Sequence, residues 1–318
     1  MQRVLTTVTL LGLLVATAAA FAITEHLKLE KSPIYGTKIY SGKPGAPALF
    51  SPRCGSGCAT RAAHVRLRLR HTGRVTVTIV DSDGHKVATI APDVLMQARL
   101  PLTFPWHGRT DAGALAPDGV YYPVVQIPRR KFKFINKITL DTVPPTVVSA
   151  AGVKQKPVLF AGPGRSVAIR YHFSEKAHPV VYLGGRRVTL GHHTRQTDKV
   201  KWAGKVDHRP LPAGTYVLSI GALDPAGNET PAGDRKSVTV VLRYVEVTPA
   251  VTRVAAGKHF KVHVETAARR YNWRLGQQHG ARRGRTLRLR APTTPGTYRL
   301  VVTVNGHATT AVIRVHAK

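Results

Sequence analysis

The chain has 318 residues, a formal net charge of +32 and only two cysteines. This length suits two or three domains of ordinary size, and a hydrophobic content of 43% excludes a disordered basic tail. Two cysteines also exclude a disulfide-scaffold toxin, an iron–sulfur protein and an array of zinc ribbons. The 22 prolines and 28 glycines favour many turns over long helices.

The N-terminal segment begins with Arg3 and then has no charged residue from Val4 to Thr24. As a helix, these 21 residues are long enough to cross a hydrocarbon core of about 30 Å. The sequence Ala20-Phe21-Ala22 also fits a signal peptide that is cleaved after Ala22. We therefore expect residues 1–31 to be an uncleaved membrane anchor or a cleaved signal peptide. Both interpretations export the rest of the chain.

Beyond residue 31 the apolar residues alternate with polar ones, as in β-strands. In His64–Arg70, for example, Val65, Leu67 and Leu69 share one face and the arginines share the other. The segment Asp81–Gly84 predicts a turn between two such strands, and Asn305-Gly306 predicts a second hairpin. Strands of this kind bury one face, so the sequence predicts antiparallel sandwiches with their arginines in solvent.

A Gly-x-Tyr unit occurs three times, each time directly before an alternating strand. Its glycines lie 95 and then 82 residues apart, a spacing that matches sandwiches of about 100 residues. Each unit follows a tryptophan, and each tyrosine hydroxyl is expected to return to the backbone as a tyrosine corner. The third tryptophan, Trp273, lies among arginines and is left open between core and ligand surface. The predicted structural core residues are Trp106, Tyr121, Trp202, Tyr216 and Tyr298.

These repeats predict an all-β chain of tandem Ig-like antiparallel β-sandwiches preceded by one N-terminal hydrophobic helix. The paired prolines Pro144-Pro145 form a stiff linker after the first sandwich. The predicted domains are residues 32–143, 144–243 and 244–318.

Part of this sequence resembles a known family. Trp106-His107-Gly108-Arg109 through Tyr121, preceded by VTVTIVDSDGHKV, is similar to the Ig-like domain of bacterial flagellar hook-cap proteins, a module found in many secreted bacterial proteins. The family has an aspartate where this chain has His107. Ala222–Asn228 resembles the closing turn of other bacterial Ig-like repeats. The resemblance covers about residues 60–242 and implies the fold, not a flagellar role.

Cys54 and Cys58 are expected to form a disulfide, because an exported chain meets an oxidising environment. A redox-active pair or a metal site lacks the surrounding motif that either would need. His259 and His263 share a strand face, but no carboxylate is evident to orient them on a metal. The sequence contains no Gly-x-Ser-x-Gly, P-loop or His-Glu-x-x-His motif. We therefore predict no catalytic residue, no cofactor and no metal.

The most suggestive feature is an arginine cluster in the third predicted domain. Guanidinium groups bind phosphate and carboxylate through paired hydrogen bonds. Two smaller basic runs lie at residues 129–133 and 186–187. The predicted polyanion-binding residues are Arg269, Arg270, Arg274, Arg282, Arg283, Arg285, Arg288 and Arg290.

Together these features predict an exported, membrane-tethered protein with a structural or adhesive role in the cell envelope. Its expected partner is an anionic envelope polymer or an envelope protein, not a specific nucleic acid, because no helix is available for a major groove. One alternative is a protein-interaction module whose charge only solubilises it. A second is an envelope hydrolase with a loop-borne site. The sequence does not predict the oligomeric state.

Overall fold

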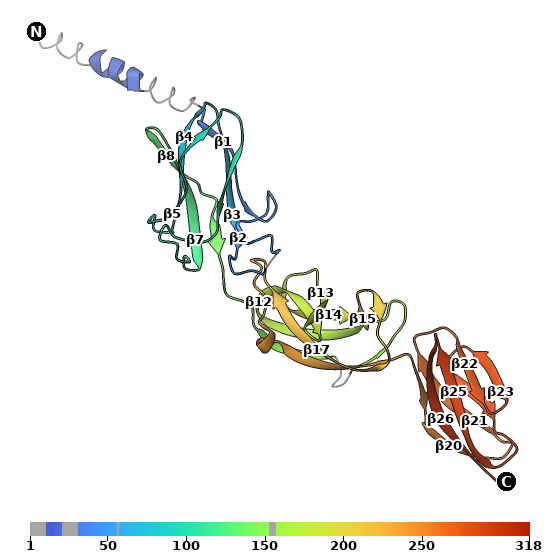
Figure 1. Ribbon diagram of the computed structural model, residues 1–318. Coiled ribbons are helices and arrows are strands. Elements are labelled where there is room, and N and C mark those ends of the chain that lie inside the picture. The colour runs from blue at the N-terminus through green and yellow to red at the C-terminus, as the bar shows by residue number, and fades with distance from the viewer. Residues whose placement is uncertain (1–10, 21–30, 56, 153–156) are drawn as a thin grey trace, which may run out of the picture. The chain divides into compact units, whose positions relative to one another are not determined.

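The computed structural model describes residues 11–20, 31–55, 57–152 and 157–318 (Figure 1). Residues 11–20 form a helix, and almost all other regular structure is β, which confirms the predicted fold class. Among the described residues, no helix has both the length and the apolar character needed to span a membrane. The rest of the predicted anchor or signal peptide, including the site after Ala22, lies outside the described residues.

The chain forms two compact units, residues 1–142 and 143–318. The first unit has one hydrophobic core, and the second has two separate ones. We use the predicted ranges 32–143, 144–243 and 244–318 as names for the first, second and third modules.

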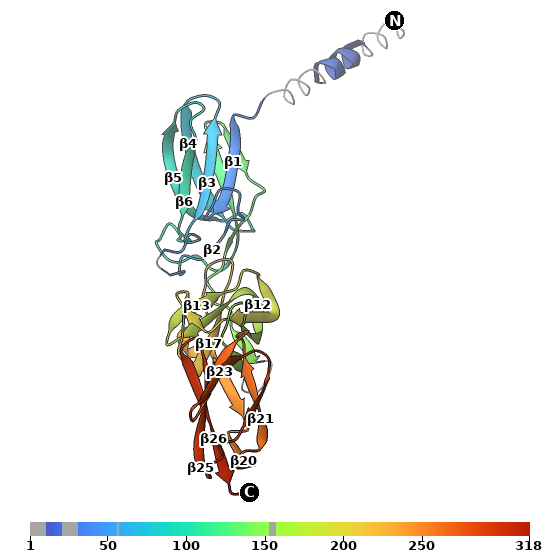
Figure 2. The ribbon, with the colours of Figure 1, turned by 90° about the vertical axis from the view of Figure 1, so that its right-hand side faces the viewer.

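The first module is a sandwich of two sheets, which Figures 1 and 2 show from two sides. Its strands are β1 (Ile34–Ser41), β2 (Leu49–Phe50), β3 (Ala63–Leu69), β4 (Gly73–Val80), β5 (Lys86–Met96), β6 (Leu102–Trp106), β7 (Gly119–Ile127), β8 (Arg130–Lys133) and β9 (Ile138–Leu140). The small sheet has the order β1-β3-β6, and the large sheet has the order β2-β9-β7-β4-β5, with β8 beside β7. The alternation predicted for β3 and the hairpin β4–β5 are confirmed.

The second module uses one long strand in both of its sheets. Its elements are β10 (Val147–Gly152), β11 (Val158–Phe160), β12 (Val167–Leu183), β13 (Arg186–Leu190), β14 (Arg195–Trp202), β15 (Lys205–Val206), β16 (Arg209–Pro210), β17 (Gly214–Leu223), a 3-10 turn η1 (Ala232–Asp234) and β18 (Lys236–Arg243). The first half of β12 pairs with β10 and β14 in the small sheet. Its second half pairs with β13 and β17 in the large sheet, which continues to β18 and β11.

The third module has the same strand order, but two separate strands, β21 and β22, take the place of the long strand β12. Its strands are β19 (Val245–Thr248), β20 (Val251–Ala255), β21 (His259–Thr266), β22 (Tyr271–Leu275), β23 (Gln278–Arg282), β24 (Thr286–Arg290), β25 (Gly296–Val304) and β26 (His307–His316). The small sheet is β19-β21-β24 and the large sheet is β20-β26-β25-β22-β23. The predicted Asn305-Gly306 hairpin joins β25 to β26 and is confirmed.

All three modules therefore share one topology. In each, a short early strand pairs in parallel with the last strand: β2 with β9, β11 with β18, and β20 with β26. Each module also has a tyrosine corner, in which the tyrosine hydroxyl donates to a backbone carbonyl four residues earlier. The bonds run from Tyr121 to Pro117 at 2.5 Å, from Tyr216 to Pro212 at 2.8 Å, and from Tyr298 to Thr294 at 2.9 Å.

The first two modules add a tryptophan at the end of the small sheet. Trp106 and Trp202 are 2% and 1% exposed. Each ring meets its module's corner tyrosine edge to face, with centroids 4.9 Å apart for Tyr121 and 5.9 Å for Tyr216. Each indole N–H donates to a carbonyl three residues on. These two rings fill the same position in two cores.

A glycine two residues after Trp106 and another two residues after Trp202 let the backbone pack closely against the core. Gly108 and Gly204 have φ values of +71° and +70°. A Cβ atom there would lie 2.7 Å from Leu140 in the first module and 2.8 Å from Leu242 in the second. The Trp-x-Gly sequence is therefore required by both backbone conformation and space.

The third tryptophan is not part of this repeat. Trp273 lies in β22 of the large sheet, whereas Trp106 and Trp202 end β6 and β14 of the small sheets. In the third module the buried residue that follows β24 is Ala291. The third module therefore has no tryptophan at the position of Trp106 and Trp202.

Candidate functional site: a cationic surface on the third module

The outer face of the small sheet of the third module is cationic because β21 and β24 alternate strictly. Leu287 and Leu289 are buried in the core, as are Phe260 and Val262 on the neighbouring strand. The residues between them point outward and are exposed. Period-2 alternation thus separates the aliphatic residues from the charged ones on both strands.

The register of these two strands places two like charges, Lys261 and Arg288, directly opposite one another. His259 faces Arg290 in the same way. We call these four residues the cationic face. Like charges at directly opposed positions of an antiparallel pair are destabilising. Arg290 is partly held, because its Nε donates to the Gly257 carbonyl at 2.9 Å.

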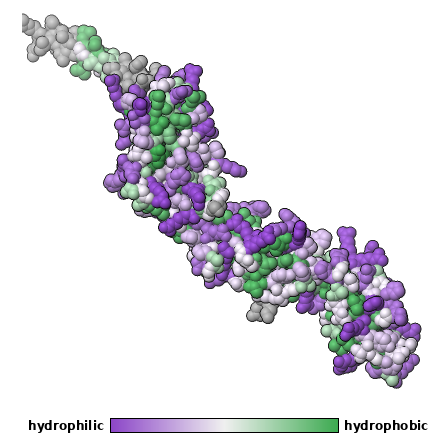
Figure 3. All heavy atoms as spheres, in the orientation of Figure 1, coloured by the Kyte–Doolittle hydropathy of each residue, from purple (hydrophilic) through white to green (hydrophobic). Residues whose placement is uncertain are grey.

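Carboxylates do not offset this charge. Residues 244–318 contain fourteen lysines and arginines but only two acidic residues, Glu246 and Glu265. Glu246 pairs with Arg243, just outside the module. Within the part of the chain that the structure describes, no lysine or arginine of residues 253–318 forms an ion pair. Figure 3 shows hydrophilic residues over much of the visible surface here.

Five further arginines gather at one end of the module. The connection from β21 to β22 and the connection from β23 to β24 lie at the same end, since the Val264 amide donates to the Arg285 carbonyl at 2.7 Å and Tyr271 pairs with Arg282. All five side chains are exposed. We call this set the arginine end: Arg269, Arg270, Arg282, Arg283 and Arg285.

Arg274 lies elsewhere. It is exposed on the outer face of the large sheet, opposite Val301 of β25 and His279 of β23. The structure thus places seven of the eight predicted arginines on the cationic face or the arginine end, and separates Arg274 from them. The reason is alternation: Tyr271 and Leu275 point into the core, so Arg274 must point away from it on the opposite sheet.

Trp273 lies on the core side of its strand and is not part of the cationic surface. It is half-buried and packs against the third hydrophobic core. A Cβ atom at Gly280 would lie 3.2 Å from its ring, so the ring would have to shift by a few tenths of an ångström to admit a larger residue. Burial also raises the pKa of neighbouring Tyr271, while Arg282 lowers it.

The sequence did not predict Lys261 as a member of the cationic face. The alternation of apolar and polar residues in His259–Val264 predicts that Lys261 is exposed. The sequence does not show that this strand lies beside Thr286–Arg290. His259 and His263 do share the exposed face, as expected.

The cysteines and acidic residues of the first module have structural roles. Cys54 and Cys58 form the predicted disulfide, with their Cα atoms 5.9 Å apart. Asp81, Asp83 and His85 bring possible metal-ligand atoms within 4.8 Å of one another. The Asp81 carboxylate, however, accepts the backbone N–H of Asp83 at 3.0 Å and of His85 at 2.8 Å, as a turn-capping aspartate does.

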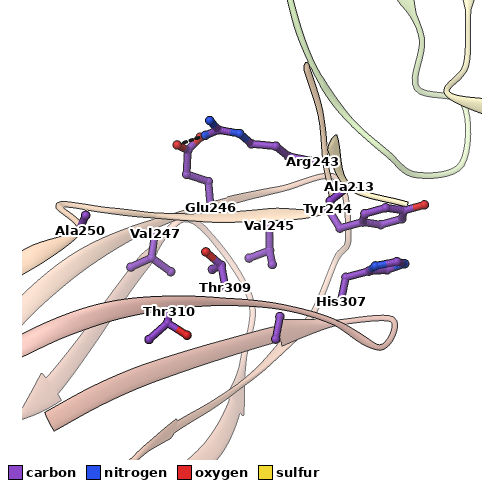
Figure 4. A pocket seen from close by; sticks show the side chains of 11 residues that line it. Ala213, Arg243, Tyr244, Val245, Glu246, Val247, Ala250, His307, Thr309 and Thr310 are labelled. Atoms are coloured by element: carbon purple, nitrogen blue, oxygen red, sulfur yellow. Dashed lines mark hydrogen bonds and ion pairs between the residues drawn. The ribbon is translucent and has the colours of Figure 1, made fainter. Parts of the chain in front are cut away.

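A pocket in the second unit lies around residues 243–247 and 307–310 (Figure 4). Arg243 forms an ion pair with Glu246, and the Tyr244 ring stacks on His307 with centroids 3.5 Å apart. The Tyr244 hydroxyl donates to the Leu211 carbonyl at 2.7 Å, and burial raises its pKa. The ion pair offsets the charges of Arg243 and Glu246 at this pocket.

Comparison with known proteins gives only distant similarity. No protein-family model and no curated protein matches the chain. Among solved structures, fibronectin(III)-like modules of Clostridium thermocellum CbhA are 12% identical and cover 64% of this chain and 94% of theirs, with a TM-score of 0.34. The Bacteroides ovatus glucan-utilization protein SGBP-B, solved with a mixed-linkage heptasaccharide, is 13% identical. That match covers 80% of this chain and 64% of SGBP-B, so the chain spans less than two thirds of it, at a TM-score of 0.26.

A third similar structure contains three N-terminal domains of the bacteriophage RB49 outer capsid protein Hoc. It is 12% identical, covers 89% of this chain and 99% of that chain, and has a TM-score of 0.24. Since all three TM-scores are below 0.5, these similarities bear on neither ligand nor activity.

Proposed function

We propose that this chain is an exported, membrane-tethered multi-Ig protein that captures an anionic polymer of the cell envelope. The third module would bind the polymer through the cationic face and the arginine end, and the protein would have a structural or adhesive role rather than a catalytic one. The proposal includes the three predicted domain boundaries and a hook-cap-type first module.

The observation that carries this proposal is the direct opposition of Lys261 and Arg288, neither of which forms an ion pair with a carboxylate in the described part of the chain. Such a pair raises the energy of the free protein, and a bound anion relieves it. Arginine also binds phosphate and carboxylate oxygens through two parallel hydrogen bonds. A polymer with repeated anionic groups would therefore bind along the strands rather than at one point.

The test is binding of the full-length chain in detergent to two polyanions, polyphosphate and poly-L-glutamate, at increasing salt. The comparison of the two probes separates phosphate from carboxylate preference. If about five anionic groups are engaged, affinity should fall by about 100-fold or more between 50 and 200 mM salt. Affinity that is insensitive to salt would contradict electrostatic capture and favour the protein-interaction alternative.

A matched pair of variants locates the site. Neutralising the cationic face with Lys261→Gln and Arg288→Gln should reduce affinity at least tenfold. The control, Arg299→Gln with Arg314→Gln, removes the same charge from exposed positions on the large sheet and should have a small effect. Equal losses in the two variants would mean that net charge, not this face, drives binding.

A further inference from the structure

The second charged surface of interest is the end of the first module at which β1 begins. The connections β3–β4, β5–β6 and β7–β8 all lie there, because Ile34 pairs with Leu69, Gly73 with Met96, and Thr76, near the start of β4, with Gln126, near the end of β7. Figures 1 and 2 show the beginning of β1 and the connection to β4 at the same end of this module. We call it the proximal end.

Charges are segregated along the first module. Five of the six aspartates of residues 31–142 lie in connections at or toward the opposite end. The sixth, Asp93, forms an ion pair with Arg74 at 2.8 Å. Apart from Asp93, the charged residues in the described proximal connections and the strand ends beside them are all cations. Their exposed basic residues are Arg70, Arg74, Arg99, Arg129, Arg130 and Lys131.

Two of these arginines occupy backbone conformations that favour glycine. Arg99 and Arg129 both have a φ of +66°. Arg129 follows Pro128 in the two-residue connection from β7 to β8, where a positive φ at the second position is normally supplied by glycine or asparagine. An arginine at each tip therefore costs backbone energy. The positive φ at Arg99 and Arg129 therefore favours a function for the two arginine side chains.

Apolar side chains lie among these cations. Leu95 and Leu100 are 58% and 55% exposed, and Leu95 is directly opposite Arg74 on the neighbouring strand. Exposed aliphatic residues within a basic surface are typical of segments that lie at a membrane interface. There the cations meet anionic headgroups while the apolar side chains enter the acyl boundary.

The sequence keeps the proximal end close to the apolar N-terminal segment. Only the seven residues 25–31 separate Thr24 from Ser32, which limits the reach to about 25 Å even for a fully extended chain. We propose that the proximal end of the first module docks on anionic phospholipid headgroups, with Leu95 and Leu100 entering the interface. This inference rests on the membrane tethering in the proposed function, but not on polymer capture by the third module.

The test uses the full-length chain reconstituted with vesicles of phosphatidylcholine, or of phosphatidylcholine mixed with phosphatidylglycerol, containing brominated acyl chains. Leu100→Trp places a fluorophore at the proximal end, and the unsubstituted chain, with Trp106 and Trp202 buried, supplies the baseline. The matched control is Ile135→Trp, because Ile135 is 91% exposed in the same module but away from this end. We expect quenching of Trp at position 100 in anionic vesicles only, and none beyond baseline at position 135.

Charge reversal then tests whether the basic residues of the proximal end cause the docking. Arg99→Glu with Arg129→Glu should return quenching at position 100 to baseline, whereas Lys43→Glu with Arg53→Glu, at the opposite end, should leave it unchanged. Equal quenching in neutral vesicles, or at positions 100 and 135, would overturn the proposal. Vesicle flotation separates the two claims: a chain that floats with both lipids but is not quenched is tethered and does not dock.

Discussion

The second and third modules have the same topology and the same tyrosine corner, yet they differ in core and in surface. The second fills the end of its small sheet with Trp202 and closes it with Gly204, whereas the third has Ala291 after the equivalent strand. The two modules thus share their strand pairing and their corner tyrosine. The buried tryptophan at the end of the small sheet is present in the second module but not in the third.

Their surfaces differ in how charge is compensated. In the second module Glu229 accepts hydrogen bonds from Tyr182, Arg187 and Arg235, and Arg186 pairs with Asp207. The third module has fourteen basic residues and two acidic ones. Residues 144–243 contain fifteen basic and six acidic residues. Both modules are therefore net positive, and they differ in how many carboxylates they have to pair with their basic residues.

The largest expected effect is on the tryptophan core. Trp202→Ala should destabilise the second module by about 3–5 kcal/mol, because it removes a fully buried ring. Trp273→Ala should cost the third module clearly less, since that ring is only half-buried. Native-state hydrogen exchange of the full chain reports each module separately. Equal losses of unfolding free energy in the two modules would mean that Trp202 and Trp273 stabilise them equally.

The glycine after the tryptophan gives the next effect. Gly204→Ala combines a positive φ with a Cβ atom 2.8 Å from Leu242, and should cost about 2–4 kcal/mol. Gly284→Ala is the control in the third module, because it has a positive φ but no atom within 4 Å. It should cost about 1 kcal/mol by denaturant unfolding. A similar loss in both would show that space at Gly204 is unimportant.

A pH dependence should distinguish the second module. Burial, and secondarily Asp198, raises the pKa of Tyr171 to about 12. Below the unfolded pKa of about 10 the neutral phenol stabilises the fold fully, and as pH rises toward 12 about 2–3 kcal/mol of that stability is lost. Tyr171→Phe should reduce the loss of unfolding free energy between pH 10 and pH 12. Part of the loss should remain, because burial and Glu229 also raise the pKa of Tyr182 in the same module. An unchanged slope would assign the dependence to other groups.

The tyrosine corner should give the smallest loss. Tyr298→Phe removes the hydroxyl that donates to the Thr294 carbonyl, and should cost about 0.5–1.5 kcal/mol. Tyr216→Phe should cost a similar amount, because Tyr216 is likewise only partly buried. Thermal unfolding measures both. If Tyr298→Phe alone caused a negligible loss of stability, the fold of the third module would not depend on the hydrogen bond of its tyrosine corner.

The sequence was sufficient to predict the strands, hairpins and corner tyrosines, because alternation and Gly-x-Tyr are local signals. It could not predict the parallel pairing of β2 with β9, since two-residue strands have no periodicity. The place of Trp273 stayed open in the sequence, because a tryptophan's position before a Gly-x-Tyr unit does not fix which sheet contains it. For the cationic face, the sequence predicted Arg288 and Arg290 but not Lys261, because their proximity depends on the pairing of distant strands.

The most direct test of the central claim is Arg288→Glu, with two readouts. The substitution places a carboxylate opposite Lys261 and should raise stability by about 0.2–1 kcal/mol. The same variant should bind polyphosphate at least tenfold more weakly at 50 mM salt, which a folding defect does not explain. Unchanged binding by this more stable variant would contradict polymer capture by the cationic face.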